Sequence, residues 1–404
     1  MKLSKLSRTI LVSSLGLVVA TLLTSCEIVT IDYVFVANSA GTGSSTTGQI
    51  QTFDADSLTG ALRNGAAAPV SSGGNNPVAI AITADYNNLY VVNQASNNVV
   101  HFTIADTGAL TQKDTITTSP SPNYIQVNTA GTYLYVVSGP NPAVLTAYSL
   151  SSGTIGGVVG QMTLSLPSNA GDTMAPTGVT VLANNGAVYV TAYDQSAYNP
   201  GGATTSIANP GWIFGYVVGS NGALAPAAGS PYKAGVKPVA LAADPTNRFM
   251  YVTDFASNQM IGYTIQSGSV LNFLINGPFA TGSEPTALTV DPRGKYIYVT
   301  NGLTSSVTAY SIDLATGTPA ATINTTGSQT NSTDTDPVSV AMDAALGRFV
   351  YTANYLGNSI SGFRANPDTG ALTQSQATPY PSGLKPAVVA TVPHGNHSIQ
   401  SVTP

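Results

Sequence analysis

The chain has 404 residues, and only 8% of them are charged, against about a quarter in typical soluble domains. Its formal net charge is −5, from 13 Lys and Arg against 18 Asp and Glu. These sparse, mildly acidic charges exclude a nucleic-acid-binding protein, which needs clustered Lys and Arg, and a single cysteine excludes an internal disulfide.

The first 25 residues predict an export signal. Lys2, Lys5 and Arg8 form a basic start, and an apolar run follows over residues 9–23. This run is shorter than the about 20 residues of a membrane-spanning helix, so it is typical of a cleaved signal peptide.

The signal ends at Leu23-Thr24-Ser25-Cys26, which resembles the lipobox of bacterial lipoproteins. In that class the peptide is cut before the cysteine, which is then acylated. The resemblance implies that Cys26 is a lipidation site, that residues 26–32 are a short tether, and that the protein is anchored by lipid to the cell envelope. Because Glu27 is not the aspartate that favours inner-membrane retention, the outer membrane is the expected address in a Gram-negative cell.

After the tether, three motifs recur seven times each, in phase, and a fixed repeat of this kind indicates a solenoid or propeller. Tyrosines open a strand-like Tyr-Val or Tyr-Thr pair at Tyr33, Tyr90, Tyr135, Tyr189, Tyr251, Tyr298 and Tyr351. Prolines open an alternating apolar run at Pro77, Pro122, Pro176, Pro238, Pro285, Pro337 and Pro386. Hairpin glycines lie at Gly60, Gly108, Gly153, Gly222, Gly268, Gly317 and Gly370.

Each repeat has room for four strands. In the unit that starts at Pro77, strand-like runs occupy residues 78–82, 89–93, 99–104 and 109–111. Gly108 supplies the positive φ that a tight hairpin requires between the last two runs. The sequence therefore predicts an all-β, seven-bladed β-propeller with four-stranded blades.

The repeats begin with the second strand of a blade, at Tyr33, and end with an unpaired first strand over residues 387–392. We expect this C-terminal strand to complete the N-terminal blade, because closure leaves no sheet edge exposed. Residues 33–392 then form one propeller, followed by a tail over 393–404. An insertion over 194–212 and a Thr-, Asn- and Ser-rich connection over 324–336 interrupt the regular repeat.

Tyr298-Val299-Thr300-Asn301 and the Thr-Gly-Ala-Leu turns resemble the YVTN-type repeats of the lactonase-type seven-bladed propellers, which include 6-phosphogluconolactonases. Lactone sites of that family use His, Arg and Glu around the central cavity, with Gly-Pro-Arg-His opening a first strand and Asn-Glu closing a second strand. Here the openings are Val236-Lys237-Pro238-Val239 and Ser283-Glu284-Pro285-Thr286, and the ends are Thr253-Asp254 and Thr300-Asn301. No catalytic residue is therefore carried over from the family.

The three histidines predict no catalytic or metal centre. His101 falls in a third strand, where a packing or surface role is expected, and His394 and His397 lack a third ligand nearby in sequence. Asp-x-Asp pairs at Asp54/Asp56 and Asp334/Asp336 are expected to form Asx turns. Polar residues that end the second strands are expected to cap turns: Asn38, Asn93, Ser138, Asp254, Asn301 and Asn354. We expect no cofactor and no metal.

Charges gather at one repeat position, the residue before the proline of the first strand. The seven residues are Asn76, Ser121, Ala175, Lys237, Glu284, Asp336 and Lys385. Here the chain turns towards the axis, so four charges in four consecutive blades should surround one mouth of the channel. They could form a rim of ion pairs or a polar-ligand site. Trp212, the only tryptophan, is expected to overhang the same mouth from the insertion.

The sequence thus predicts a monomeric binding or scaffold module at the membrane surface, which recognises a polar small molecule, a glycan or a protein through Lys237, Glu284, Asp336, Lys385 and Trp212. The alternative is a lactone hydrolase, with Glu284 or Asp336 as general base and Lys237 or Lys385 stabilising the oxyanion. Pairing of these charges across the rim would favour the binding module, and convergence on one pocket would favour the enzyme.

Overall fold

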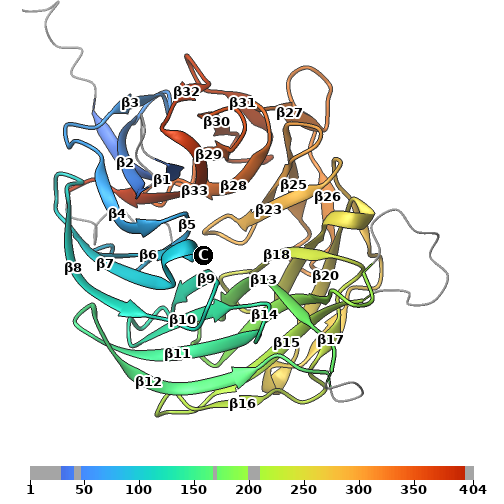
Figure 1. Ribbon diagram of the computed structural model, residues 1–404. Helices are drawn as coiled ribbons and strands as arrows, with labels where there is room; N and C mark the ends of the chain where they lie inside the picture. Colours follow the sequence, from blue (N-terminus) through green and yellow to red (C-terminus); the bar gives the residue numbers. More distant parts are fainter. Residues whose placement is uncertain (1–28, 41–46, 167–170, 199–209, 396–404) are drawn as a thin grey trace, which may run out of the picture.

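The computed structural model describes residues 29–40, 47–166, 171–198 and 210–395. They form seven antiparallel sheets around one axis, each with its innermost strand at the channel (Figure 1). The predicted seven-bladed propeller is confirmed. The signal peptide, Cys26, most of the insertion and His397 lie outside the described residues.

The second blade shows the common plan, because its strands run outwards from the channel in chain order: β5 (Pro77–Ile82), β6 (Asn88–Asn93), β7 (Asn98–Ile104) and β8 (Leu110–Thr117). The other innermost strands are β9 (Pro122–Val127), β13 (Met174–Val181), β18 (Pro238–Ala243), β23 (Pro285–Val290), β28 (Pro337–Met342) and β33 (Leu384–Pro393). The other second strands are β1 (Thr30–Ala40), β10 (Tyr133–Ser138), β14 (Ala187–Asp194), β19 (Phe249–Asp254), β24 (Tyr296–Asn301) and β29 (Phe349–Asn354).

The other third strands are β2 (Thr47–Asp56), β11 (Val144–Ser151), β15 (Gly211–Val218), β20 (Gln259–Ile265), β25 (Ser306–Ile312) and β30 (Ser359–Ala365). The third blade ends with one long outer strand, β12 (Thr154–Thr163). In five blades the outer strand is instead split into two segments that pair with different halves of the third strand. These segments are β3 (Leu62–Asn64) and β4 (Val70–Asn75), β16 (Leu224–Pro226) and β17 (Tyr232–Lys233), β21 (Leu271–Phe273) and β22 (Phe279–Ala280), β26 (Pro319–Ala321) and β27 (Thr330–Ser332), and β31 (Leu372–Gln374) and β32 (Tyr380–Pro381).

Three single-turn 3-10 helices complete the described elements: η1 (Gln94–Ser96), η2 (Phe255–Ser257) and η3 (Ser267–Ser269). The first two follow directly on a second strand. Among the described residues, no helix is long and apolar enough to cross a membrane.

The C-terminal strand closes the ring as predicted. β33 pairs antiparallel with β1, so that Val392 lies opposite Tyr33 and Val388 opposite Ala37. The first blade is thereby built from both ends of the chain (Figure 1). The innermost and second strands of each blade then protect each other's backbone hydrogen-bonding groups.

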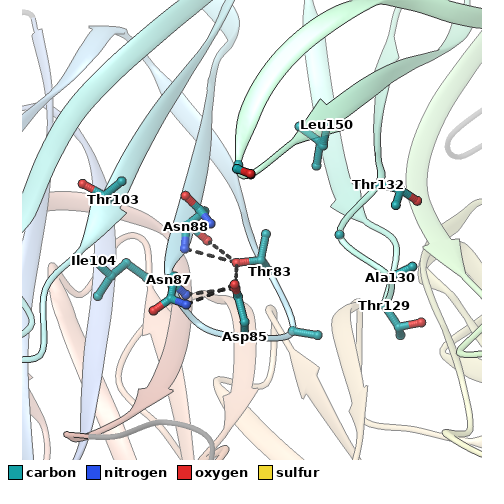
Figure 2. A pocket seen from close by; sticks show the side chains of 14 residues that line it. Thr83, Asp85, Asn87, Asn88, Thr103, Ile104, Thr129, Ala130, Thr132 and Leu150 are labelled. Atoms are coloured by element: carbon teal, nitrogen blue, oxygen red, sulfur yellow. Dashed lines mark hydrogen bonds between the residues drawn. The ribbon is translucent and has the colours of Figure 1, made fainter.

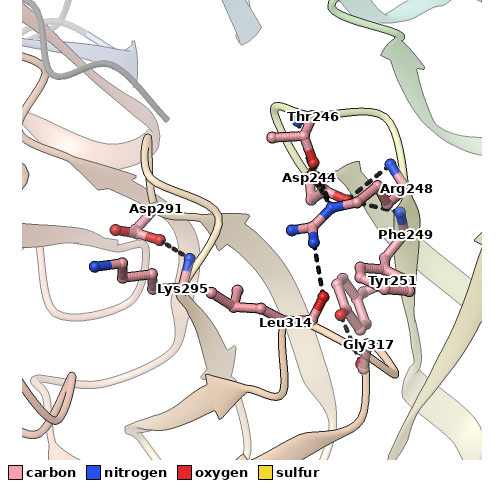
Figure 3. Close-up of polar contacts among 9 residues, drawn as sticks. All are labelled: Asp244, Thr246, Arg248, Phe249, Tyr251, Asp291, Lys295, Leu314 and Gly317. Carbon is pink, nitrogen blue, oxygen red and sulfur yellow. Dashed lines mark hydrogen bonds and ion pairs between the residues drawn. The ribbon is translucent and has the colours of Figure 1, made fainter.

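Three of the recurring tyrosines donate hydrogen bonds to recurring glycines across the blade interfaces. Tyr251 donates its hydroxyl hydrogen to the carbonyl oxygen of Gly317 in the next blade at 2.7 Å, and Figure 3 shows this contact beside the bond from Arg248 to the Leu314 carbonyl. Tyr90 bonds Gly153 in the same way at 2.6 Å, and Tyr351 bonds Gly60 at 2.9 Å, which ties the seventh blade to the first. Each bond contributes about 1 kcal/mol.

Candidate functional site

The predicted mouth of the channel is built by an unusual backbone conformation. Of the seven residues before the first-strand prolines, five have positive φ, between 52° and 58°: Asn76, Ser121, Glu284, Asp336 and Lys385. This left-handed conformation costs about 1–2 kcal/mol for a residue with a side chain. Such strain persists only where the surrounding structure enforces it.

The preceding blade and the residue's own blade enforce it with hydrogen bonds on both sides of the residue. The side chain of Asn258 accepts the backbone N–H of Glu284 at 2.7 Å, and Asn358 accepts that of Lys385 at 2.8 Å. The carbonyl oxygen of Glu284 accepts the N–H of Gly302 at 2.8 Å. Because the backbone is held by its neighbours, the side chain at this position is free to face the mouth.

Lys237 is held by its backbone and surrounded by aromatic rings. The buried carboxylate of Asp254 accepts the backbone N–H of Lys237 at 2.9 Å. Its ammonium nitrogen lies 4.4 Å from the ring centre of Phe255, 5.3 Å from that of Tyr198 and 5.7 Å from that of Tyr193. Burial lowers the pKa of Lys237, and the nearby Glu284 carboxylate opposes this shift. Cation–π contacts therefore orient the ammonium group without neutralising it.

Glu284 and Asp336 lie close enough to influence each other. Burial raises the pKa of Asp336, and the negative charge of Glu284 raises it further. A methyl group added to Gly302 would lie 3.1 Å from Asp336 Oδ1 and 3.0 Å from Thr286 Cγ2. The Asp336 carboxylate therefore reaches across the sixth blade to the channel entrance, where Thr286 lines the wall.

The side chains of Lys237, Glu284 and Asp336 form no ion pair within 4 Å of one another. The three ion pairs among the described residues involve His101, Arg248 and Arg293 instead. The three side chains of the mouth are nevertheless coupled electrostatically in the order of their blades, Lys237 to Glu284 and Glu284 to Asp336. The arrangement is thus not a self-paired rim. We call Lys237, Glu284 and Asp336 the charged mouth.

The other two predicted residues lie at its margins. Lys385 is exposed, and its ammonium nitrogen lies 5.7 Å from the ring centre of Tyr355. Trp212 stacks on Lys233, its cross-strand neighbour on β17, at 3.5 Å, and it packs on the hydrophobic cluster between the third and fourth blades. The structure therefore corrects the expected position of Trp212, because strand pairing at the start of β15 directs this ring into blade packing.

A cavity of about 290 Å³ begins directly beneath the charged mouth. All seven innermost strands line it with the residues that follow their prolines. Its polar lining residues are Tyr124, Thr177, Thr286 and Ser339, and the remaining lining residues are Val, Ala, Ile, Leu and Gly. The cavity is at the small end of ligand pockets, which hold about 300–1,000 Å³. Ionisable side chains are thus supplied by the charged mouth and not by the wall.

Two histidines and one of the polar strand ends make contacts within the blades. His101 is buried in β7, and His394 packs on Tyr33 with ring centres 5.1 Å apart. Asn354 donates to Ser359 and Ser361, so it caps its turn. Asp56 accepts the N–H of Leu58 in an Asx turn. Among the described residues, no three His, Cys, Asp or Glu side chains gather as a metal site requires.

The aromatic residues around Lys237 were missed by the sequence interpretation. A signal was present, because Phe255 directly follows the polar end of β19 and Tyr355 follows that of β29. Phe255 lies near the pre-proline lysine of its own blade, whereas Tyr355 lies near the pre-proline lysine of the next blade.

Comparison with known proteins agrees with this architecture. The family model "Lactonase, 7-bladed beta-propeller" matches residues 26–118 and 104–396. The periplasmic gluconolactonase of Pseudomonas aeruginosa is 19% identical, with a TM-score of 0.71 over 90% of this chain and 99% of that one. A putative 6-phosphogluconolactonase from Bacteroides fragilis is 18% identical, with a TM-score of 0.69 over 90% and 98%. A search of curated proteins finds no significant match.

Identities below 20% carry the fold but not the activity. The family match, in contrast, spans nearly the whole propeller. The chain therefore belongs to the lactonase family of seven-bladed β-propellers.

Proposed function

We propose that this protein hydrolyses a small sugar lactone at the charged mouth. The observation that carries the proposal is that Lys237, Glu284 and Asp336 form no ion pair with one another and influence each other electrostatically, at positions that directly precede strands lining a cavity of about 290 Å³. Family membership supports the same reaction. The binding role that the sequence favoured becomes the second candidate, because family membership favours hydrolysis. The absence of His, Arg and Glu from the wall of this cavity keeps the binding role a candidate.

The chemistry requires a base, a cation and a water molecule. Asp336 accepts a proton from water as the water oxygen attacks the lactone carbonyl carbon, and the Lys237 ammonium stabilises the negative charge that develops on the carbonyl oxygen. The ring C–O bond then breaks, and the leaving oxygen takes the proton from Asp336 to give the hydroxy acid. Glu284 keeps the pKa of Asp336 raised, which makes its carboxylate a stronger base.

The test is hydrolysis of D-glucono-1,5-lactone by the purified protein, measured by acid release against the spontaneous rate. General-base catalysis contributes about 10²–10⁴-fold, so Asp336→Asn should lose at least about 100-fold of the enzymatic rate. Lys237→Gln should also lower the rate. Matched controls are Asp368→Asn and Lys295→Gln, both exposed on turns of the opposite face, which should leave the rate unchanged.

Two results would overturn this function. The rate with protein could equal the spontaneous rate for glucono-, galactono- and 6-phosphogluconolactone, or hydrolysis could persist at the wild-type rate in Asp336→Asn. Saturable lactone binding without turnover, lost in Lys237→Gln, would establish the second candidate, a binding module.

We further propose that the protein acts at the cell envelope as a monomer anchored by acyl chains on Cys26. The basic start and lipobox of the sequence support this location. Incorporation of labelled palmitate into the wild-type protein and not into Cys26→Ser would test it, and equal labelling of both would contradict it.

A further inference from the structure

The second strands of the blades share a packing rule at the end opposite the charged mouth. At five interfaces, an aromatic ring at the start of the second strand covers the hairpin glycine of the next blade so closely that a Cβ on the glycine would lie under 3 Å from the ring. The pairs are Tyr33 with Gly108, Tyr133 with Gly222, Phe249 with Gly317, Tyr296 with Gly370 and Phe349 with Gly60. These rings fill the space between the blades.

Two interfaces depart from this rule: Ala187 begins the second strand at the interface of the fourth and fifth blades, and a polar residue does so at the interface of the second and third blades. Asn88 begins β6 in place of an aromatic residue, and its amide group faces Gly153. Beside it lies a cleft of about 690 Å³, which Figure 2 shows between the turns of the two blades. Its volume falls within the range of ligand pockets. The side chains that line it include Thr83, Asp85, Asn87, Thr103, Thr132 and Ser152.

A second departure from the repeat lies directly behind Asn88. The third-strand residue that faces the second-strand aromatic is small in the other six blades: Thr52, Ala147, Gly215, Gly262, Ala309 and Gly362. In the second blade this residue is His101, which is 2% exposed and stacks on Tyr90 with ring centres 4.9 Å apart. Two neighbouring deviations from the repeat therefore meet at one interface.

The imidazole of His101 fixes the position of Asn88. His101 Nε2 lies 2.9 Å from Asn88 Oδ1, and His101 Nδ1 lies 2.6 Å from Asp114 Oδ1. A register shift in the pairing of β7 with β8 brings Asp114 opposite His101. The other carboxylate oxygen of Asp114 accepts the N–H of Ile155 from the third blade at 3.0 Å. With Oδ1 occupied, Asn88 offers its amide nitrogen to the cleft.

The lining selects a class of ligand by its chemistry. Threonine and serine hydroxyls donate and accept, and the Asn87 and Asn88 side chains add amide groups. Asp85 is the one charged residue in the lining. Burial alone would raise its pKa, but hydrogen bonds from Thr83 and Asn87 outweigh burial and hold the pKa of Asp85 below its ordinary value. A fixed negative charge disfavours anions, and hydroxyl-rich walls suit a ligand with many hydroxyl groups.

We propose that the cleft between the second and third blades is a binding site for a neutral oligosaccharide, positioned by Asn88 through its contact with His101. The site lies at the turns opposite the charged mouth, so it is independent of the proposed hydrolysis. Its hydroxyl and amide groups exchange hydrogen bonds with sugar hydroxyls, and the missing aromatic ring provides the space.

The experiment is isothermal titration of the purified protein with maltotriose, cellotriose and triacetylchitotriose. At least one should bind, and Thr103→Trp, which fills the cleft, should weaken that binding at least about tenfold, or about 1.4 kcal/mol. The matched control is Thr264→Trp. Thr264 occupies the same register in the fifth blade and makes the same contact with an outer-strand carbonyl, at 3.4 Å against 3.5 Å for Thr103. This control should bind like the wild type.

A second variant guards against misfolding. Asn88→Phe introduces the aromatic ring that five other interfaces have, so it should also abolish binding while the protein still unfolds cooperatively. The proposal fails if none of the three sugars binds, or if binding survives in both Thr103→Trp and Asn88→Phe. It also fails if Lys237→Gln removes binding while Thr103→Trp and Asn88→Phe both keep it, because the sugar would then occupy the charged mouth.

Discussion

The interblade tyrosine bonds allow a quantitative test, because two tyrosines of the repeat, Tyr135 and Tyr298, lack a hydrogen-bond partner among the described residues. Tyr251 donates to the Gly317 carbonyl at 2.7 Å, whereas the buried hydroxyl of Tyr298 has no hydrogen-bond partner among the described residues. Both side chains are fully buried. Replacing each by Phe removes the same oxygen atom from the same register of neighbouring blades.

The two substitutions should differ in size and in sign. Tyr251→Phe leaves the Gly317 carbonyl without this donor, and an unsatisfied buried group costs about 1–3 kcal/mol. Tyr298→Phe removes a hydroxyl that is buried without a bond, so the free energy of unfolding should stay unchanged or rise by about 1 kcal/mol. We therefore expect a difference of about 2 kcal/mol between the variants.

Urea unfolding followed by circular dichroism measures this difference, provided that both variants unfold cooperatively with the same dependence on denaturant. Tyr90→Phe, which loses a bond of 2.6 Å to Gly153, should match Tyr251→Phe. Equal losses in Tyr251→Phe and Tyr298→Phe would refute the reasoning, because ring packing and not hydrogen bonding would then explain the repeated tyrosine.

Three further predictions concern pH and closure. Hydrolysis needs ionised Asp336, so the rate should fall as pH drops through the raised pKa of Asp336. Glu284→Gln removes a negative neighbour and should therefore move this acidic limb of the pH–rate profile to lower pH. An acidic limb at the same pH would contradict the coupling of the two carboxylates. Burial and Asp343 raise the pKa of Asp32 well above its ordinary value, so the stability that Asp32 contributes is present at low pH and is lost as pH rises. Asp32→Asn should reduce this loss of stability between pH 4 and 8 in thermal melts. The same pH dependence in the variant and the wild type would contradict this role of Asp32. Deleting β33 should remove most of a free energy of unfolding of about 5–15 kcal/mol, whereas a truncated protein that melts at the wild-type temperature would disprove closure by this strand.

The sequence predicted the blades well because their determinants are local and repeated. The alternation after Pro77 and the hairpin at Gly108 recur in every unit, so seven weak signals support one another. The split outer strands were not predicted, since segments as short as Phe279–Ala280 are held by pairing with β20 and not by their own residues. Pairing partners of this kind are invisible in a local pattern.

The candidate site was predicted only in part. The shared repeat position predicted that Lys237, Glu284 and Asp336 lie at the same mouth. It did not predict that these charges form no ion pairs with one another. Trp212 was misplaced because the register of β15 against β17 determines where its ring lies. Asp114 could not be linked to His101, since an irregular pairing of β7 with β8 creates their contact.

The left-handed residues of the mouth have a consequence for how such proteins diversify. Glu284 and Lys385 have their backbone held by an asparagine of the preceding blade, and Glu284 also by a turn amide of its own blade, so the fold makes little use of the side chains at this position. Asn, Ser, Glu, Asp and Lys already occupy equivalent places in one molecule. The propeller thus offers a set of interchangeable positions around a single opening, where new specificities can be introduced by substitution without redesigning the scaffold.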